Sequence, residues 1–178
     1  MDNINAKALD ILLKNGEKAI VNKNEMLLET NKICRHVYFI NKGILRTFYY
    51  DQKGNNISHW FSSEGDSLTI LSSLIKEEPS HYGIQALEDC EIIMLNKKIL
   101  ERIQSESPEF NRFLQDYLID AAINIADRLV DIQIRSAKER YDKLLETHPD
   151  ILQRVNLGHI ASYLGITQQS LSRIRSQH

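Results

Sequence analysis

The stretch NLGHIASYLGITQQSLSRIR, from Asn156 to Arg175, predicts two short helices joined by a tight turn. Gly165 ends the first helix, because glycine adopts the left-handed backbone conformation of a tight turn at little cost. Thr167 is then a suitable N-cap for a second helix that begins at Gln168. The apolar residues of the stretch recur at helical spacing: Leu157, Ile160, Ala161, Leu164, Ile166, Leu171 and Ile174. This combination is typical of a helix-turn-helix.

The second of these helices presents a polar outer face without an acidic residue. Such a face suits base-pair edges in the major groove, where arginine recognises guanine, glutamine recognises adenine, and hydroxyls contact base or phosphate. The net charge of −2 excludes a uniformly basic nucleic-acid binder, but residues 153–178 include three arginines and no Asp or Glu. A local cationic patch is what phosphate contact requires. The predicted DNA-contacting residues are Thr167, Gln168, Gln169, Ser170, Ser172, Arg173 and Ser176.

A long helix is predicted upstream, over residues 108–136, with Ser107 as its N-cap and Pro108 in its first turn. Its apolar stripe consists of Leu114, Leu118, Ala121, Ile125, Leu129 and Ile132. The stripe either packs on the core of its own domain or forms a two-fold coiled-coil seam between two copies of the chain. The seam is favoured, because the helix is longer than a small β domain needs. Two helix-turn-helix units held about 34 Å apart by a two-fold axis match successive major grooves.

The first half of the chain has the pattern of a small β domain. Residues 67–78 fit a short helix better than a strand, and a further helix is expected over 137–146. Many short strands at regular spacing indicate an antiparallel sandwich or barrel, so the expected fold class is α+β. Runs rich in β-branched and aromatic residues predict strands within residues 18–22, 25–29, 36–41, 43–50, 56–62 and 83–96.

The order of these parts resembles the Crp/Fnr family of bacterial transcription regulators. The resemblance is carried by VYFINKGILRTFYYDQKGNNISHWFSSEGD in the first half and, more specifically, by IASYLGITQQSLSRI near the end. It implies a cyclic-nucleotide-binding-like antiparallel β-roll (a jelly roll) over 1–107, a dimerisation helix over 108–136 and a DNA-binding helix-turn-helix domain over 137–178. It also places the base-reading positions on Gln168, Gln169 and Arg173.

The sequence departs from that family in three ways. The family often has Arg-Glu where Gln168 and Gln169 stand, so the target sequence is expected to differ. A β-hairpin wing follows the recognition helix in the family, whereas this sequence stops at His178, so the wing is expected to be absent or truncated. The third departure concerns the ligand site.

The stretch GDSLTILSSLIKEEPSHYGIQA lacks the charged residues that hold a cyclic nucleotide in the family. Apolar residues around Ile70 stand where the family has the Glu that binds ribose, and Ser80 stands where it has the Arg that binds phosphate. A phosphate buried without a cation loses more than its contacts return, so tight binding of cyclic AMP is not expected. A pocket for another ligand or for none is predicted along Leu68, Ile70, Leu71, Leu74, Ser80, His81 and Tyr82.

Two other classes of function stay open. His36, His59 and His81 could bind metal or haem in a cupin-like barrel, but they lie more than twenty residues apart in sequence. The chain could also be an interaction module with a helical tail that does not bind DNA, although such a tail would tolerate acidic residues on its last helix. Cys34 and Cys90 are expected to be reduced thiols, because two cysteines cannot complete a four-cysteine zinc or iron–sulfur site.

The expected role is regulation rather than catalysis, because no catalytic motif is present. The N-terminus lacks the pattern of a secretory signal, and no apolar run could span a bilayer, so a cytoplasmic location and no membrane partner are expected. The expected partners are double-stranded DNA and a second copy of the chain, with RNA polymerase as a further candidate. No cofactor is predicted.

Overall fold

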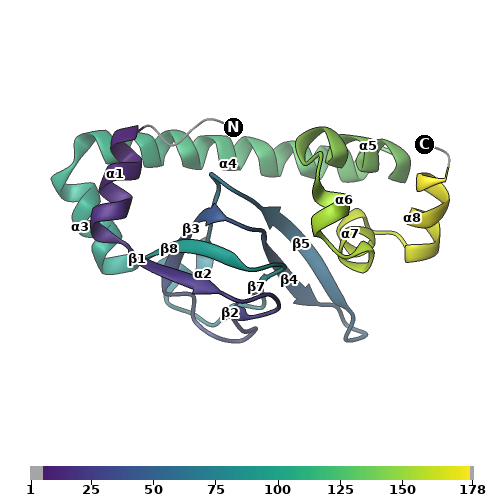
Figure 1. The fold of residues 1–178 in the computed structure, drawn as a ribbon, viewed down its shortest axis with the longest axis horizontal. Coiled ribbons are helices and arrows are strands. Elements are labelled where there is room, and N and C mark those ends of the chain that lie inside the picture. The colour runs from purple at the N-terminus through teal and green to yellow at the C-terminus, as the bar shows by residue number, and fades with distance from the viewer. Residues whose placement is uncertain (1–5, 177–178) are drawn as a thin grey trace.

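In the computed structural model, which describes residues 6–176, an antiparallel β-roll is followed by a long helix and a set of short helices (Figure 1). The strands are β1 (Glu17–Val21), β2 (Met26–Leu28), β3 (His36–Lys42), β4 (Leu45–Tyr50), β5 (Asn56–Ser62), β6 (Ser67–Leu68), β7 (Gly83–Ala86) and β8 (Cys90–Asn96). The helices are α1 (Ala6–Asn15), α2 (Leu71–Lys76), α3 (Lys97–Glu106), α4 (Pro108–Ile134), α5 (Ala137–Thr147), α6 (Ile151–Arg154), α7 (Leu157–Leu164) and α8 (Gln168–Arg175).

The roll is built from two four-stranded antiparallel sheets, in the orders β1-β8-β3-β6 and β2-β7-β4-β5. Side chains from both sheets meet in one core, which includes Tyr38 of β3, Leu45 of β4, Ile84 of β7 and Ile92 of β8. Cys34 and Cys90 are free thiols buried in this core. The predicted α+β class and the antiparallel roll are therefore confirmed.

Several local predictions differ from the observed elements. The expected helix over 67–78 is shorter, because Ser67 and Leu68 pair with β3 before α2 begins. The long helix ends at Ile134, because Ser136 caps the next helix in a capping box with Glu139. Helices α1, α3 and α6 were not predicted.

The long helix α4 runs beside the roll and on to the C-terminal helices (Figure 1). Its first turn is anchored by Phe110, which is fully buried in a second core with residues of α1, α3 and the roll. Farther along, the Tyr117 hydroxyl donates to the carbonyl oxygen of Ser67, 2.8 Å away. None of the helices within residues 6–176 is long and apolar enough to cross a membrane.

A third apolar cluster joins the roll to the helices at the C-terminal end. The roll contributes Ile44, Phe61 and Leu87. The helical side consists of Tyr141, Leu144, Ile151, Val155, Ile160, Ala161, Leu164 and Leu171. Because this cluster is shared, helix α7 lies directly against β5 (Figure 1).

Candidate nucleic-acid interface

Helices α7 and α8 form the predicted helix-turn-helix. Asn156 caps α7, and Gly165 ends it in the left-handed conformation at φ 68°. Thr167 caps α8 by accepting the backbone N–H of Ser170 at 3.2 Å. Leu171 of α8 is fully buried against α7, as its spacing predicted. The order of cap, turn and apolar positions in the sequence is thus realised.

The outer face of α8 carries most of the residues that were predicted to contact DNA. Those that are exposed are Thr167, Gln168, Gln169, Ser172, Arg173 and Ser176. Ser170 is half-buried, and its hydroxyl lies 3.0 Å from the Thr167 hydroxyl. These two hydroxyls are therefore engaged in the cap of α8, and the glutamines and Arg173 are the longer side chains that project outward.

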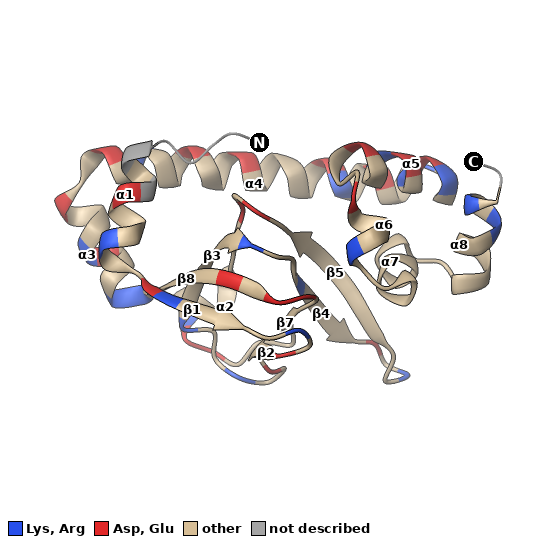
Figure 2. Ribbon diagram, in the orientation of Figure 1, with Lys and Arg blue, Asp and Glu red and all other residues tan. Residues whose placement is uncertain are grey.

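A shallow groove of about 520 Å³ runs over this face. It is lined by Leu157, Gln168, Gln169, Ser172 and Arg173. Figure 2 shows basic residues in the last turn of α8, where Arg173 and Arg175 lie. Arg154, which was counted with them on sequence grounds, lies apart in α6 and contacts carboxylates of the roll instead. The cationic patch is therefore narrower than predicted.

Two arginines hold the C-terminal end of α7. Arg128 of α4 donates to the carbonyl oxygen of Tyr163 at 3.0 Å and stacks over the Tyr163 ring, 3.7 Å from its centroid. Arg140 of α5 donates to the carbonyl oxygen of Leu164 at 2.9 Å. Both cations meet the negative end of the helix dipole and satisfy carbonyl groups that a helix leaves open. The position of α7 is therefore linked to that of α4.

A polar contact across the interface fixes the middle of α7 on the roll. Arg46 of β4, only 3% exposed, donates to Gln85 through two nitrogens and to Ser58 and His159 through a third. Burial lowers the pKa of Arg46 to about 10. The backbone N–H of Ser58 also donates to the Ser162 hydroxyl at 3.1 Å.

The contact with Arg46 determines the protonation of His159. An arginine is always a donor, so Nδ1 of His159 must accept, at 3.0 Å, and the ring must be neutral. Burial first, and the Arg46 charge second, lower the pKa of His159 to about 4. The sequence analysis missed these residues, and the available signal was an arginine inside the apolar strand GILRTFYY.

The residues of the predicted ligand pocket lie in different surroundings. Leu68 and Ile70 are buried in the core of the roll, whereas Leu74 belongs to the core under α4. Leu71 and His81 are exposed. Ser80 is buried, and its hydroxyl accepts the backbone N–H of Tyr82 at 2.9 Å. Tyr82 itself packs against Tyr49 and His59, with ring centroids 5.8 and 5.0 Å away.

A larger groove, of about 1240 Å³, lies elsewhere, between β5, α4 and the helix-turn-helix. Tyr49, His59, Trp60, Ile125 and Arg128 are among its lining residues. Within residues 6–176, no group of three or more His, Cys, Asp or Glu side chains is placed to hold a metal ion.

The predicted dimerisation stripe is mostly open to solvent in the single chain. Leu118, Ile125, Leu129 and Ile132 are 41%, 64%, 59% and 54% exposed. Leu114 is partly buried against the core under α4, and Ala121 is half-buried. A neighbouring line of apolar side chains on α4 is also exposed: Ile119, Ile123, Val130 and Ile134.

Comparison with known proteins identifies the roll first. Residues 18–107 match the family model described as the cyclic nucleotide-binding domain. The chain is 24% identical over 181 residues to the transcriptional regulatory protein Btr of Bordetella pertussis, a match that covers 95% of this chain and 73% of Btr.

Solved structures share the arrangement of roll, long helix and C-terminal helices. FixK2 of Bradyrhizobium japonicum is 18% identical and superposes with a TM-score of 0.77, over 91% of this chain and 83% of FixK2. A putative Crp/Fnr family regulator of Eubacterium rectale is 17% identical, with a TM-score of 0.73 over 98% of this chain and 83% of its own. At these identities the similarity concerns the fold.

The neutral state of His159 predicts a pH dependence of stability. The unfolded chain takes up a proton near the ordinary histidine pKa of 6.5, whereas folded His159 does so only near pH 4. This group therefore lowers the free energy of unfolding as pH falls from 6.5 to 4. In His159→Gln, the amide oxygen can accept from Arg46 without titrating. We expect urea denaturation to show a smaller loss of stability between pH 7 and pH 4.5 in the variant than in the wild type.

His81→Gln is the matched control, because His81 is exposed on the roll. The control is expected to follow the wild-type pH profile. Identical profiles for His159→Gln and the wild type would show that His159 does not carry this dependence.

Proposed function

The chain belongs to the family of cyclic nucleotide-binding domains, and on that premise we propose that it is a sequence-specific DNA-binding transcription regulator that acts as a homodimer. The role is one of binding rather than catalysis, and it places the protein in the cytoplasm with RNA polymerase as a further partner. The proposed division is a roll over 1–107, a dimerisation helix over 108–136 and a DNA-binding unit from residue 137. The name of Btr as a transcriptional regulatory protein supports the proposal.

The observation that carries the proposal is the outer face of α8. It projects Gln168, Gln169 and Arg173 from a capped helix whose opposite face is buried, and no acidic residue lies on it. A helix of this kind fits the major groove, and its amide and guanidinium groups match adenine and guanine edges.

Dimerisation is supported by the exposed apolar side chains of α4. Ile125 and Leu129 lie one turn apart with more than half of each side chain exposed. A helix of 27 residues extends about 40 Å, long enough for a two-fold partner to bury this stripe. Such pairing would relate the two copies of α8 by a two-fold axis, as recognition of successive major grooves requires.

The first experiment is selection of genomic DNA fragments by the purified protein at two salt concentrations. We expect a recurring two-fold-symmetric site whose binding weakens steeply as salt rises, because phosphate contacts release counterions. Scattered fragments with no common site would contradict the proposal.

On that selected site, Arg173→Ala is expected to weaken binding by about 1–3 kcal/mol, the usual value of an arginine contact to a base edge. Fluorescence anisotropy titration at fixed salt measures the loss. Arg35→Ala removes the same charge at an exposed position of the roll and is expected to bind as the wild type does. Equal affinities for the two variants would mean that the reading face has been misassigned.

Dimerisation is tested by Ile125→Glu. A glutamate in the middle of the seam would bury an unpaired charge, so the variant is expected to sediment as a monomer at concentrations where the wild type is a dimer. Ile20→Glu is the control, because Ile20 is 78% exposed on β1 and lies outside α4. A dimeric Ile125→Glu would place the interface elsewhere.

The proposed regulator does not respond to cyclic AMP, even though its roll belongs to a nucleotide-binding family. Ser80 and Ile70 occupy the positions where a cation and a carboxylate are expected, and both are buried in contacts of the protein itself. Without a cation in the site, the cyclic phosphate would lose its hydration and gain no ionic contact in return. Titration calorimetry with cyclic AMP is expected to show no tight binding, and a micromolar or stronger affinity would refute this part of the proposal.

A further inference from the structure

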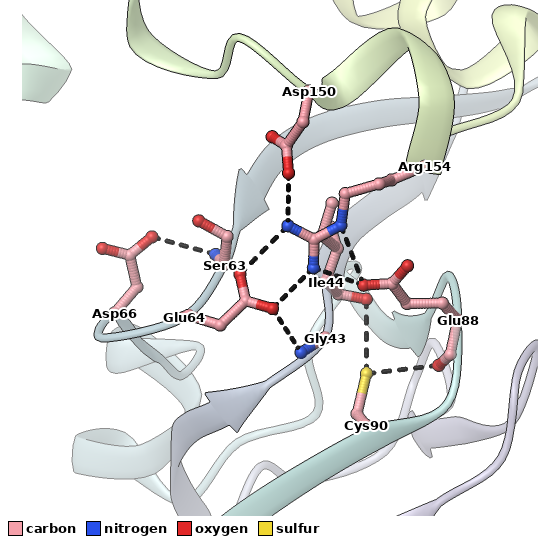
Figure 3. Close-up of polar contacts among 9 residues, drawn as sticks. All are labelled: Gly43, Ile44, Ser63, Glu64, Asp66, Glu88, Cys90, Asp150 and Arg154. Carbon is pink, nitrogen blue, oxygen red and sulfur yellow. Dashed lines mark hydrogen bonds and ion pairs between the residues drawn. The ribbon is translucent and has the colours of Figure 1, made fainter.

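Arg154 joins the helix-turn-helix to one end of the roll (Figure 3). It is the last residue of α6. Its guanidinium donates two hydrogen bonds to the Glu64 carboxylate, from Nη2 to Oε1 at 2.6 Å and from Nη1 to Oε2 at 3.0 Å. The same guanidinium contacts Glu88 through Nε and Nη2, and Nη1 donates to Asp150 at 2.9 Å. Two of these carboxylates belong to the roll and one to the helical side.

The carboxylates of the roll are themselves fixed in place. Glu64 lies in the turn between β5 and β6, and its Oε1 also accepts the backbone N–H of Gly43, at 2.8 Å, from the turn between β3 and β4. Glu88 lies in the turn between β7 and β8. Arg154 is thus connected to three turns that meet at one end of the roll, as Figure 3 shows.

The geometry of this cluster fixes orientation as well as distance. A bidentate pair between arginine and carboxylate is planar, so it restrains the angle between the groups that carry it. The Arg154 side chain is 20% exposed, and those of Glu88 and Glu64 are 29% and 42% exposed, so solvent screens the cluster only in part. Without Arg154, the two carboxylates of the roll would be left facing each other.

The pair of Arg154 and Glu64 stays ionised over the physiological pH range. Partial burial by itself would raise the pKa of Glu64, but hydrogen bonds from Arg154 and Gly43 outweigh it and bring the pKa to about 2. The hydrogen bonds that Arg154 donates to Glu64, and next to Glu88, raise the pKa of Arg154. The ion pair between Arg154 and Glu64 therefore persists over this pH range.

Only Val155 and Asn156 separate Arg154 from the first residue of α7. The N-terminal end of α7 is thus held on the roll by Arg154, while Arg128 and Arg140 hold its C-terminal end on α4 and α5. A helix fixed at both ends has a defined axis, and α8 is packed on that helix through Leu171.

We propose, on the premise that the chain binds DNA as a two-fold dimer, that Arg154 is a positioning residue for operator recognition. It fixes the angle of the helix-turn-helix on its own roll, and so it sets the separation of the two recognition helices in the dimer. Arg154 does not touch the DNA. Its contribution appears only when both half-sites are engaged at once, because the second contact depends on the effective concentration that a rigid linkage provides.

The test uses full-length dimer and three DNA duplexes: the two-fold site selected by the wild type, one isolated half-site, and the two-fold site with its spacer changed by one base pair. For Arg154→Gln, we expect about a tenfold loss of affinity for the two-fold site and less than about a twofold change for the half-site. We also expect the variant to discriminate less than the wild type against the altered spacer.

Matched variants distinguish a positioning role of Arg154 from a general loss of the folded structure. Arg102→Gln removes an exposed arginine of α3 that bonds Asn15, far from the helix-turn-helix, and is expected to behave as the wild type on all three duplexes. Glu64→Gln keeps an acceptor for Gly43 but loses the ionic grip on Arg154, so it is expected to reproduce the relaxed spacing even if Arg154→Gln does not fold.

The outcomes distinguish this inference from the proposed function. If the wild type selects no two-fold site, the proposed function fails and the inference falls with it. If the wild type selects a site but neither variant changes spacer discrimination, only the positioning role is overturned. An equal loss on the half-site and the two-fold site would also overturn it, because it would indicate a direct DNA contact or a damaged fold.

Discussion

The packing of the helix-turn-helix on the roll is the interaction on which the C-terminal half of the structure depends. Helices α6, α7 and α8 have four, eight and eight residues, and isolated helices of this length are unstable in water. They gain stability by burying one apolar face in a shared cluster to which the roll contributes Ile44, Phe61 and Leu87. The helix-turn-helix is therefore not an independent module on a flexible tether.

The polar groups between α7 and the roll fix the orientation in which α7 packs. The apolar cluster alone would tolerate some sliding of α7, since dispersion and burial are not directional. Arg46 is held by Gln85 and Ser58 of the roll and by His159 of α7. Its buried guanidinium needs all of these acceptors, because a buried donor without a partner is costly. The position of α7 on the roll is thereby set to a single arrangement.

The sequence was most informative where structure is determined locally. Gly165, Thr167 and the spacing of Leu171 predicted the turn, the cap and the buried face of α7 and α8, because each signal lies within a few residues of its effect. Most strands of the roll were predicted for the same reason, but β6 was not, because residues 67–78 were expected to form a helix. The predicted end of α4 lies two residues too far along the chain. The sequence pattern was interpreted as helical through Ser136, whereas in the structure Ser136 is the N-cap of α5.

What could not be predicted are the contacts between distant segments. Arg154 meets Glu64 and Glu88 across 90 and 66 positions of sequence, so only the fold reveals that it is not part of the cationic patch. Leu74, a residue of the predicted ligand pocket, packs in the core that includes Phe110 of α4, a contact that no local pattern indicates. Residue type predicts which interactions these side chains can make, whereas the residues that they contact depend on how the chain folds.

The arrangement of α7 also constrains how a displacement elsewhere in the chain could reach α8. One end of α7 is bound to the roll and the other to α4, so a displacement of α4 relative to the roll acts directly on α7. The groove of about 1240 Å³ is lined by residues of both β5 and α4, and its shape would change in such a displacement. A ligand could shift the equilibrium only by binding one arrangement more tightly than the other. An effector bound in this groove would therefore have to make different contacts with β5 and α4 in the two arrangements.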